Sequence, residues 1–170
     1  TQSTTIFLPD TDCVRSDKTE KERDYWVKRF RERNDLIQHM IQKNNYRFVV
    51  MGGYFTMNYC MYSNEKQKDS KKAFFEGIDK AINLVLKAGA VPVIIQDNPL
   101  LKNIDINCNV RSDKPKQFCR YDSILHFDHI KNWNLQLLHL KQKYPKLLII
   151  DFTDIVCPDG FCYSYLNHTP

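Results

Sequence analysis

The sequence predicts an α/β protein with a three-layer, flavodoxin-like fold: a mostly parallel sheet with helices on both faces. Strand-like and helix-like segments alternate along its 170 residues, which is typical of parallel strands joined by helical crossovers. In addition, residues 90–96 are apolar with almost no alternation, as in strands that are buried on both faces. This length, with 42% hydrophobic residues, predicts one domain, residues 1–170, with a full core.

The first half of the chain is predicted to form a strand, a helix and a second strand. Residues 4–8 are β-branched and aromatic, which predicts a strand. A helix follows, capped by Ser16 or Thr19 and ended by Asn44-Asn45. The helical spacing of this set places its apolar members on one stripe: Trp26, Phe30, Arg33, Ile37, Met40 and Ile41. Residues 46–51 predict a second strand, which Gly52-Gly53 ends.

The second half continues the alternation after a polar stretch at residues 63–72. Gly89 is a natural stop for the next helix, which has an apolar face of Phe74, Ile78, Ala81, Ile82, Val85 and Leu86. The strand at 90–96 then leads into a long loop, from Asp97 to about residue 127. A third helix is expected at about 127–144 and a last strand at 147–150. The apolar phase of that helix is Ile130, Trp133, Leu137 and Leu140.

The carboxyl ends of parallel strands meet at one edge of the sheet, where α/β proteins build their sites. We expect Cys13, Gly52-Gly53, Asp97 and Asp151 at this edge. The last strand runs into an acid-bearing loop and then a turn between Cys157 and Cys162, with Pro158 and Gly160 as turn residues.

The cysteines indicate the compartment of the protein and the kinds of bond that they form. Six cysteines, with none in a Cys-x-x-Cys pair, favour disulfides and an oxidising compartment over buried free thiols. We expect the local pairs Cys108–Cys119 and Cys157–Cys162. Cys13 and Cys60 either pair with each other or leave Cys13 to bond elsewhere. The spacings suit no metal site.

The net charge of +5 comes from mixed acids and bases, which does not favour a nucleic-acid partner. The first residue is Thr1, no signal peptide is visible and no run is long enough for a membrane span. The chain is therefore expected to be a processed or excised piece.

Four segments, taken in order, resemble one family. They are a strand leading to a cysteine (7–13), a strand ending in an aromatic segment (48–59), a strand leading to Asp97 and two cysteines (91–99), and the strand with the clipped loop (149–162). Together they resemble the SGNH-hydrolase-like domain fused to bacterial membrane O-acyltransferases, which acetylate lipopolysaccharide and other cell-surface glycans. The resemblance extends over nearly the whole chain.

The resemblance implies a catalytic serine in a Gly-Asp-Ser block and a histidine in an Asp-x-x-His block. These blocks would fall before Thr1 and after Pro170, so the domain is expected to be incomplete at both ends and no catalytic residue is assigned in this chain. No serine lies on a strand-to-helix elbow. Asp128 and His129 are neighbours that do not face each other on a helix. His39 and His139 lie within expected helices, where a structural or exposed role is favoured, and His126 lies at a helix start. His168 lies in an expected site-edge loop, but it precedes the position that the resemblance implies for the catalytic histidine.

The best site candidates follow the second strand. By the resemblance, Gly53 and Asn58 lie near the oxyanion donors of such enzymes, and Tyr54 and Tyr59 line a sugar-binding wall. The alternative is a turn with aromatic core residues.

The implied function is transfer of an acyl group, acetyl above all, to a hydroxyl of a cell-surface glycan such as lipopolysaccharide. A membrane acyltransferase portion would deliver the acyl group, with no cofactor and no metal, in a periplasmic domain tethered to the inner membrane. Two alternatives remain open. One is a catalytically incompetent extracytoplasmic module that binds glycan or acts as a scaffold, and the other is a free-standing SGNH esterase.

Overall fold

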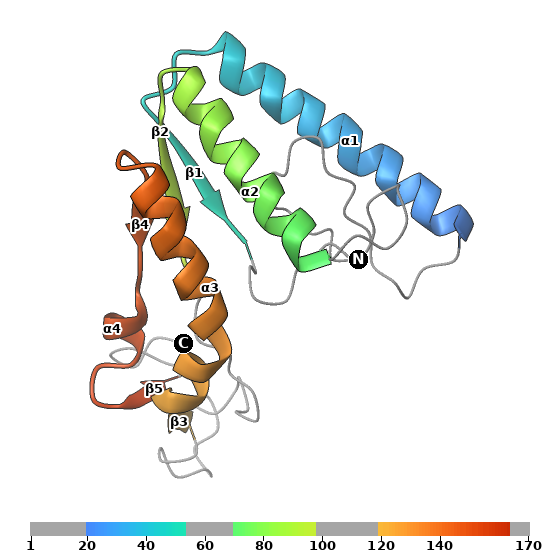
Figure 1. Ribbon diagram of the computed structural model, residues 1–170. Helices are drawn as coiled ribbons and strands as arrows, with labels where there is room; N and C mark the ends of the chain where they lie inside the picture. The colour runs from blue at the N-terminus through green and yellow to red at the C-terminus, as the bar shows by residue number, and fades with distance from the viewer. Residues whose placement is uncertain (1–19, 54–69, 98–118, 164–170) are drawn as a thin grey trace.

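The computed structural model of the chain describes residues 20–53, 70–97 and 119–163 (Figure 1). Helices and strands alternate in it, which confirms the predicted α/β class. The elements are α1 (Glu20–Lys43), β1 (Phe48–Gly52), α2 (Ser70–Lys87), β2 (Val91–Ile95), β3 (Arg120–Asp122), α3 (Ser123–Lys143), β4 (Leu148–Ile150), α4 (Thr153–Val156) and β5 (Phe161–Tyr163). The strand expected at residues 4–8 lies outside the described residues.

The main sheet is parallel, with strand order β1-β2-β4. The chain therefore crosses it in one direction, and right-handed crossovers then place α2 and α3 on the same face. The side chains agree with this placement. Residues from α1, α2 and α3 share one core cluster with Met51 of β1 and Ile94 of β2, and these two strand residues are paired in register.

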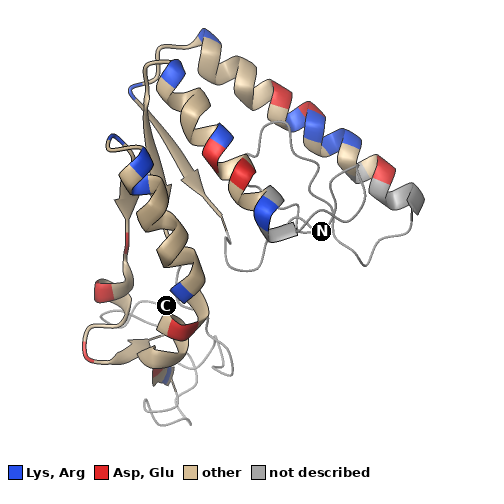
Figure 2. Cartoon of the chain, in the orientation of Figure 1, with Lys and Arg blue, Asp and Glu red and all other residues tan. Residues whose placement is uncertain are grey.

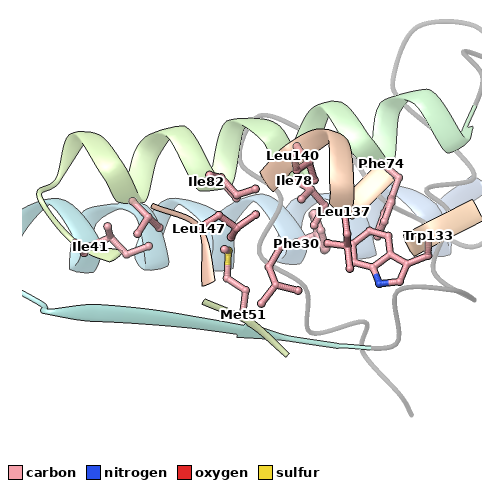
Figure 3. Close-up of a cluster of buried hydrophobic side chains, with 14 residues drawn as sticks. Phe30, Ile41, Met51, Phe74, Ile78, Ile82, Trp133, Leu137, Leu140 and Leu147 are labelled. Carbon is pink, nitrogen blue, oxygen red and sulfur yellow. The ribbon is translucent and has the colours of Figure 1, made fainter. Parts of the chain in front are cut away.

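This core fills the space between the helices and the sheet. Figure 3 shows the side chains of the cluster between α2 and strand β1. The predicted stripe of α3 is buried as expected, and so is most of that of α2. The buried apolar members are Phe30, Ile41, Met51, Phe74, Ile78, Ala81, Ile82, Val85, Ala90, Ile94, Trp133, Leu137, Leu140 and Leu147.

The opposite face of the sheet has a different environment. Because side chains alternate along a strand, Phe48 and Val50 of β1 point away from the core that holds Met51. On β4, Leu148 is level with Val50 and Ile150 with Gly52, so Leu148 and Ile150 point to this same face. These four side chains are exposed, and none of the three long helices in the described ranges packs against them.

The segment before α3 differs from the sequence prediction. The loop was expected to reach about residue 127, but β3 and the first turn of α3 occupy its end. The cause is a helix cap: Asp122 Oδ1 accepts a 2.9 Å hydrogen bond from the backbone N–H of Ile124. An aspartate at this position satisfies a free N–H of the first turn, so α3 begins at Ser123.

A second sheet, the antiparallel pair of β3 and β5, was not predicted. β3 pairs with β5, and the register sets Tyr121 opposite Cys162. Strands of three residues carry too little pattern to be recognised in a sequence. The ribbon ties the segment after β4 to the start of α3, and the backbone N–H of Ser123 donates to Gly160 O at 3.0 Å.

Replacing Gly89 with alanine is expected to destabilise the domain by about 1–2 kcal/mol. Gly89 has φ 81° just after α2, and an added Cβ would meet nothing within 4 Å, so the cost comes from the backbone conformation alone. Gly52→Ala is the matched control, because that site is equally open and has no positive φ. Urea denaturation of both variants tests this, and equal stabilities would contradict it.

Charges of both signs are mixed along α1 and α2 (Figure 2). An ion pair joins α3 to α2, with Lys143 Nζ 2.7 Å from Asp79 Oδ1.

A polar groove of about 430 Å³ lies between α1 and α2, lined by Gln38, Gln42, Lys80, Asn83, Leu84, Lys87 and Ala88. These residues belong to the carboxyl halves of both helices, which lead into the starts of β1 and β2. The groove is therefore remote from the carboxyl edge of the sheet.

Candidate active-site edge of the sheet

The three parallel strands end level with one another. The register pairs Gly52 with Ile95, and Ile95 with Ile150. The ladder continues one step further, because the N–H of Gln96 donates to Ile150 O at 2.9 Å. Gly53, Asp97 and Asp151 therefore follow the ends of three adjacent strands, as the sequence predicted for this edge.

The sequence prediction for the other edge residues stays untested. Gly53 lies half-buried in a bend after β1. Tyr54, Asn58 and Tyr59 lie outside the described residues, as does Cys13. The oxyanion role of Gly53 and Asn58 and the sugar-binding role of the two tyrosines therefore remain predictions.

His126 is the residue at this edge that sequence reasoning missed. It lies in the first turns of α3, and its side chain is only 2% exposed. Its Nε2 lies 3.5 Å from the hydroxyl of Thr153, and its Nδ1 is buried without a hydrogen-bond partner. His126 thus connects α3 to the segment that follows β4.

The signal for His126 was present in the sequence. Ser123, His126 and Ile130 continue the same buried stripe as Trp133, Leu137 and Leu140. The stripe was read only from Ile130 because the helix was expected to begin at about residue 127. Recognising Asp122 as the cap would have placed His126 on the buried face of the helix.

Two opposing effects act on the pKa of His126. Burial lowers the pKa, because it disfavours the charged imidazolium, and this effect is the largest. The carboxylates of Asp151 and Asp97 act in the opposite direction, and His129 adds to the lowering. The net shift is downward, so the folded protein favours the neutral ring.

Asp151 holds the segment after β4 in place. Its Oδ1 accepts a 2.8 Å hydrogen bond from the N–H of Thr153, which begins the single turn of α4. Thr153 is buried, and its carbonyl oxygen accepts from the N–H of Cys157 at 2.7 Å. Asp151 at the strand end, Thr153 with its hydroxyl beside His126, and Cys157 therefore lie in one short hydrogen-bonded segment.

A disulfide joins Cys157 to Cys162, with a Cα–Cα distance of 4.0 Å, and we call this closed loop the clip. Gly160 within it has φ 82°, the left-handed conformation expected of a turn glycine. Cys119 is also disulfide-bonded. Cys108, its expected partner, lies outside the described residues, and so do Cys13 and Cys60.

In chemical terms, the described edge offers hydrogen-bond donors and carboxylates around a buried neutral imidazole. Within the described ranges, no group of three or more His, Cys, Asp or Glu side chains is placed to hold a metal ion. No described helix has the length and apolar character of a membrane span. Ser123 is buried one turn before His126, but neither ring nitrogen of His126 bonds to it. Nε2 lies beside the hydroxyl of Thr153, and Nδ1 has no hydrogen-bond partner. Ser123 and His126 therefore do not form a nucleophile–base pair.

The stability of the protein should depend on pH through His126. Its pKa in the folded state lies below its usual value of 6.5, so the unfolded chain binds more protons near that pH. Its contribution to stability is therefore complete above pH 6.5 and is lost as the pH falls through the folded pKa. We expect His126→Gln to lose less stability than the wild type between about pH 7.5 and about pH 5.5.

His139→Gln is the control for this experiment, since His139 lies exposed on the same helix. Urea denaturation at both pH values gives the comparison. A pH dependence of His126→Gln as steep as that of the control variant would contradict the assignment.

Comparison with protein families identifies the chain. A family model described as SGNH domain (fused to AT3 domains) matches residues 8–170, which is nearly the whole chain. Searches of curated proteins and of solved structures gave no match. The family match confirms the resemblance drawn from the strand-end segments and agrees with the parallel sheet. The chain belongs to the family of SGNH domains fused to AT3 domains, and is thus an SGNH module associated with an acyltransferase.

Proposed function

We propose that this domain transfers an acetyl group to a hydroxyl of a cell-surface glycan, with lipopolysaccharide as the expected acceptor. The observation that carries the proposal is the family match over residues 8–170, because the family's SGNH domains are fused to AT3 domains. On this proposal, the AT3 portion of the intact protein is the membrane acyltransferase that delivers the acyl group.

The transfer follows the chemistry of an acyl-serine. The serine oxygen attacks the acyl carbon of the donor, its proton passes to a histidine, and the histidine gives that proton to the donor group as the bond from the acyl carbon to the donor breaks. The glycan hydroxyl then attacks the acyl-serine, its proton passes to the now neutral histidine, and the histidine returns it to the serine oxygen as that oxygen leaves. The serine and histidine are expected from sequence outside residues 1–170. The level strand ends support a site edge here, with Gly53 as a proposed oxyanion donor.

The compartment proposed is the periplasm, with the domain tethered to the inner membrane through the AT3 portion. The support is the Cys157–Cys162 disulfide and the second disulfide at Cys119. Such bonds persist in oxidising environments such as the bacterial periplasm.

The test is the acetylation state of the glycan in cells that produce the intact protein. We expect base-labile acetyl esters on the extracted lipopolysaccharide, detected by mass spectrometry. We expect their loss when either the SGNH portion or the AT3 portion is deleted. Membrane abundance of each deletion protein, measured by immunoblot, controls for poor production.

Two other outcomes would replace the proposal. Acetylation that persists without the SGNH portion, together with loss of glycan binding, would indicate a binding or scaffolding module. Hydrolysis of simple acyl esters without the AT3 portion, and with no transfer to glycan, would indicate an esterase.

A further inference from the structure

The antiparallel ribbon of β3 and β5 lies at the end of the molecule toward which the parallel strands run (Figure 1). Two contacts connect it to the carboxyl edge of the sheet. The backbone N–H of Ser123 donates to Gly160 O, which joins the start of α3 to the clip. One turn further along α3, His126 lies beside Thr153, which follows β4. Side chains on the ribbon are therefore neighbours of the proposed site edge.

The register of the ribbon gives it two different faces. Residues that lie opposite each other, and residues two apart on one strand, share a face. Tyr121 and Cys162 are opposite each other, and Cys162 is fully buried, so theirs is the inner face. The β3 members of the other face are exposed, and its β5 members are half-buried. With the exposed acid of the adjacent turn, they form what we call the outer ribbon face: Arg120, Asp122, Asp159, Phe161 and Tyr163.

The side chains of the outer ribbon face hold one another in place. Arg120 Cζ lies 4.1 Å from the centre of the Phe161 ring, a distance at which a cation and a ring attract each other. The hydroxyl of Tyr163 donates to Asp159 Oδ2 at 2.6 Å. This bond is the largest cause of the raised pKa of Tyr163, and a hydrogen bond from Arg120 acts in the opposite direction. Arg120 is thus positioned by two aromatic neighbours, which lowers the entropy cost of binding a ligand.

This combination of groups suits a sugar. A sugar ring presents hydroxyls, which both donate and accept hydrogen bonds, and C–H groups, which pack on aromatic rings. The guanidinium of Arg120 has five N–H donors, more than the phenol oxygen of Tyr163 can accept. The carboxylate of Asp159 supplies acceptors. The half-buried rings of Phe161 and Tyr163 supply apolar surface next to these polar groups.

The charges of the outer ribbon face favour an uncharged ligand. Its two carboxylates, Asp122 and Asp159, outnumber the single guanidinium of Arg120. A phosphate or carboxylate on the ligand would be repelled by these acids, and sites for such groups are usually built from several arginines. A neutral sugar has no charge to be repelled, and its hydroxyls can bond to both kinds of group.

We propose that the outer ribbon face binds an uncharged sugar unit of the acceptor glycan, with Arg120 and Asp159 as its hydrogen-bonding residues. The site holds the acceptor beside the edge at which one of its hydroxyls is acetylated. This inference rests on the proposed function for the identity of the ligand as the acceptor glycan. It adds the part of the chain that recognises this glycan and the kind of sugar that is recognised.

The test measures glycan binding to the intact protein in detergent by isothermal titration calorimetry. The probes are de-O-acetylated oligosaccharides of lipopolysaccharide, separated by anion exchange into a neutral fraction and a fraction with acidic groups. We expect Arg120→Ala to raise the Kd for the neutral fraction at least about tenfold, because it removes charge-assisted hydrogen bonds. Arg120→Lys keeps the positive charge but loses the planar fork of donors, so it should bind as weakly as Arg120→Ala.

Arg47→Ala is the matched control. Arg47 is also exposed, and its Cζ lies 5.3 Å from the centre of the Phe48 ring. It immediately precedes β1, so it lies at the opposite edge of the sheet. Its removal should leave the Kd unchanged. Circular dichroism of each variant shows whether the fold is retained, and Arg120→Lys keeps the test decisive if Arg120→Ala does not fold.

Four results would overturn the inference. Unchanged binding by Arg120→Ala would place the sugar elsewhere. Binding of the acidic fraction alone, or full binding by Arg120→Lys, would indicate a site for an anion. An equal loss in Arg47→Ala would show a general effect of charge. Failure of the acetyl-transfer proposal gives a different result: glycan binding that depends on Arg120, in a protein that adds no acetyl esters, would contradict that proposal and support the binding site.

Discussion

Leu137→Ala should destabilise the domain by about 3 kcal/mol, within the 2–5 kcal/mol range for truncated core leucines. Leu137 is 2% exposed and lies in the cluster that joins α3 to α2 and to the sheet (Figure 3). Removing its isobutyl group takes apolar contacts away from several elements at once and leaves a cavity that the rigid strands cannot close.

The adjacent residue provides a matched control. Leu138 has the same chemistry and the same helix, but it is 59% exposed, so Leu138→Ala is expected to change stability by no more than about 0.5 kcal/mol. Urea denaturation followed by circular dichroism measures both. Similar losses in the two variants would show that α3 does not present the buried stripe described above.

The second large effect should come from the Cys157–Cys162 disulfide. A bridge with a sequence separation of 5 closes a short ring, for which loop entropy gives a stabilisation of roughly 2 kcal/mol. We expect the double variant Cys157→Ala/Cys162→Ala to lose about this much free energy of unfolding. Substitution is preferable to a reductant, because Cys119 is also disulfide-bonded and a reductant would break both bridges.

The location of the effect is as specific as its size. Cys162 lies in β5, opposite Tyr121 of β3, so hydrogen exchange of the backbone amides should rise in residues 120–122 and 161–163. Exchange in β1 and β2 should change little, since these strands pair elsewhere. Faster exchange throughout the sheet would mean that the clip supports the whole domain, contrary to this expectation.

The elements that the sequence predicted are those with long, strong patterns. The stripe of Ile130, Trp133, Leu137 and Leu140 repeats often enough to define a helix and its buried face. The continuous apolar run around Ile94 likewise defined the central strand. The level strand ends followed from the parallel topology, which is why the edge positions of Gly53, Asp97 and Asp151 were predictable.

What the sequence did not reveal depends on local geometry and on partners distant in the chain. β3 and β5 are stable only because they pair with each other, and each is too short to carry a pattern. His126 acquires its environment from Thr153 and Asp151, which approach it only when β4 is in place beside β2. The buried stripe of α3 carries a signal for the burial of His126, but its contact with Thr153 is known only from the fold.

The parallel order of β1, β2 and β4 also affects how the chain is made. Every strand pairing in this sheet joins segments separated by an entire helix, so a ribosome must complete each crossover before the next strand finds its partner. Contacts of this kind form slowly, so the apolar strands remain exposed to solvent while the chain is being synthesised. We therefore expect the nascent chain to depend on chaperones until the segment with β4 has emerged.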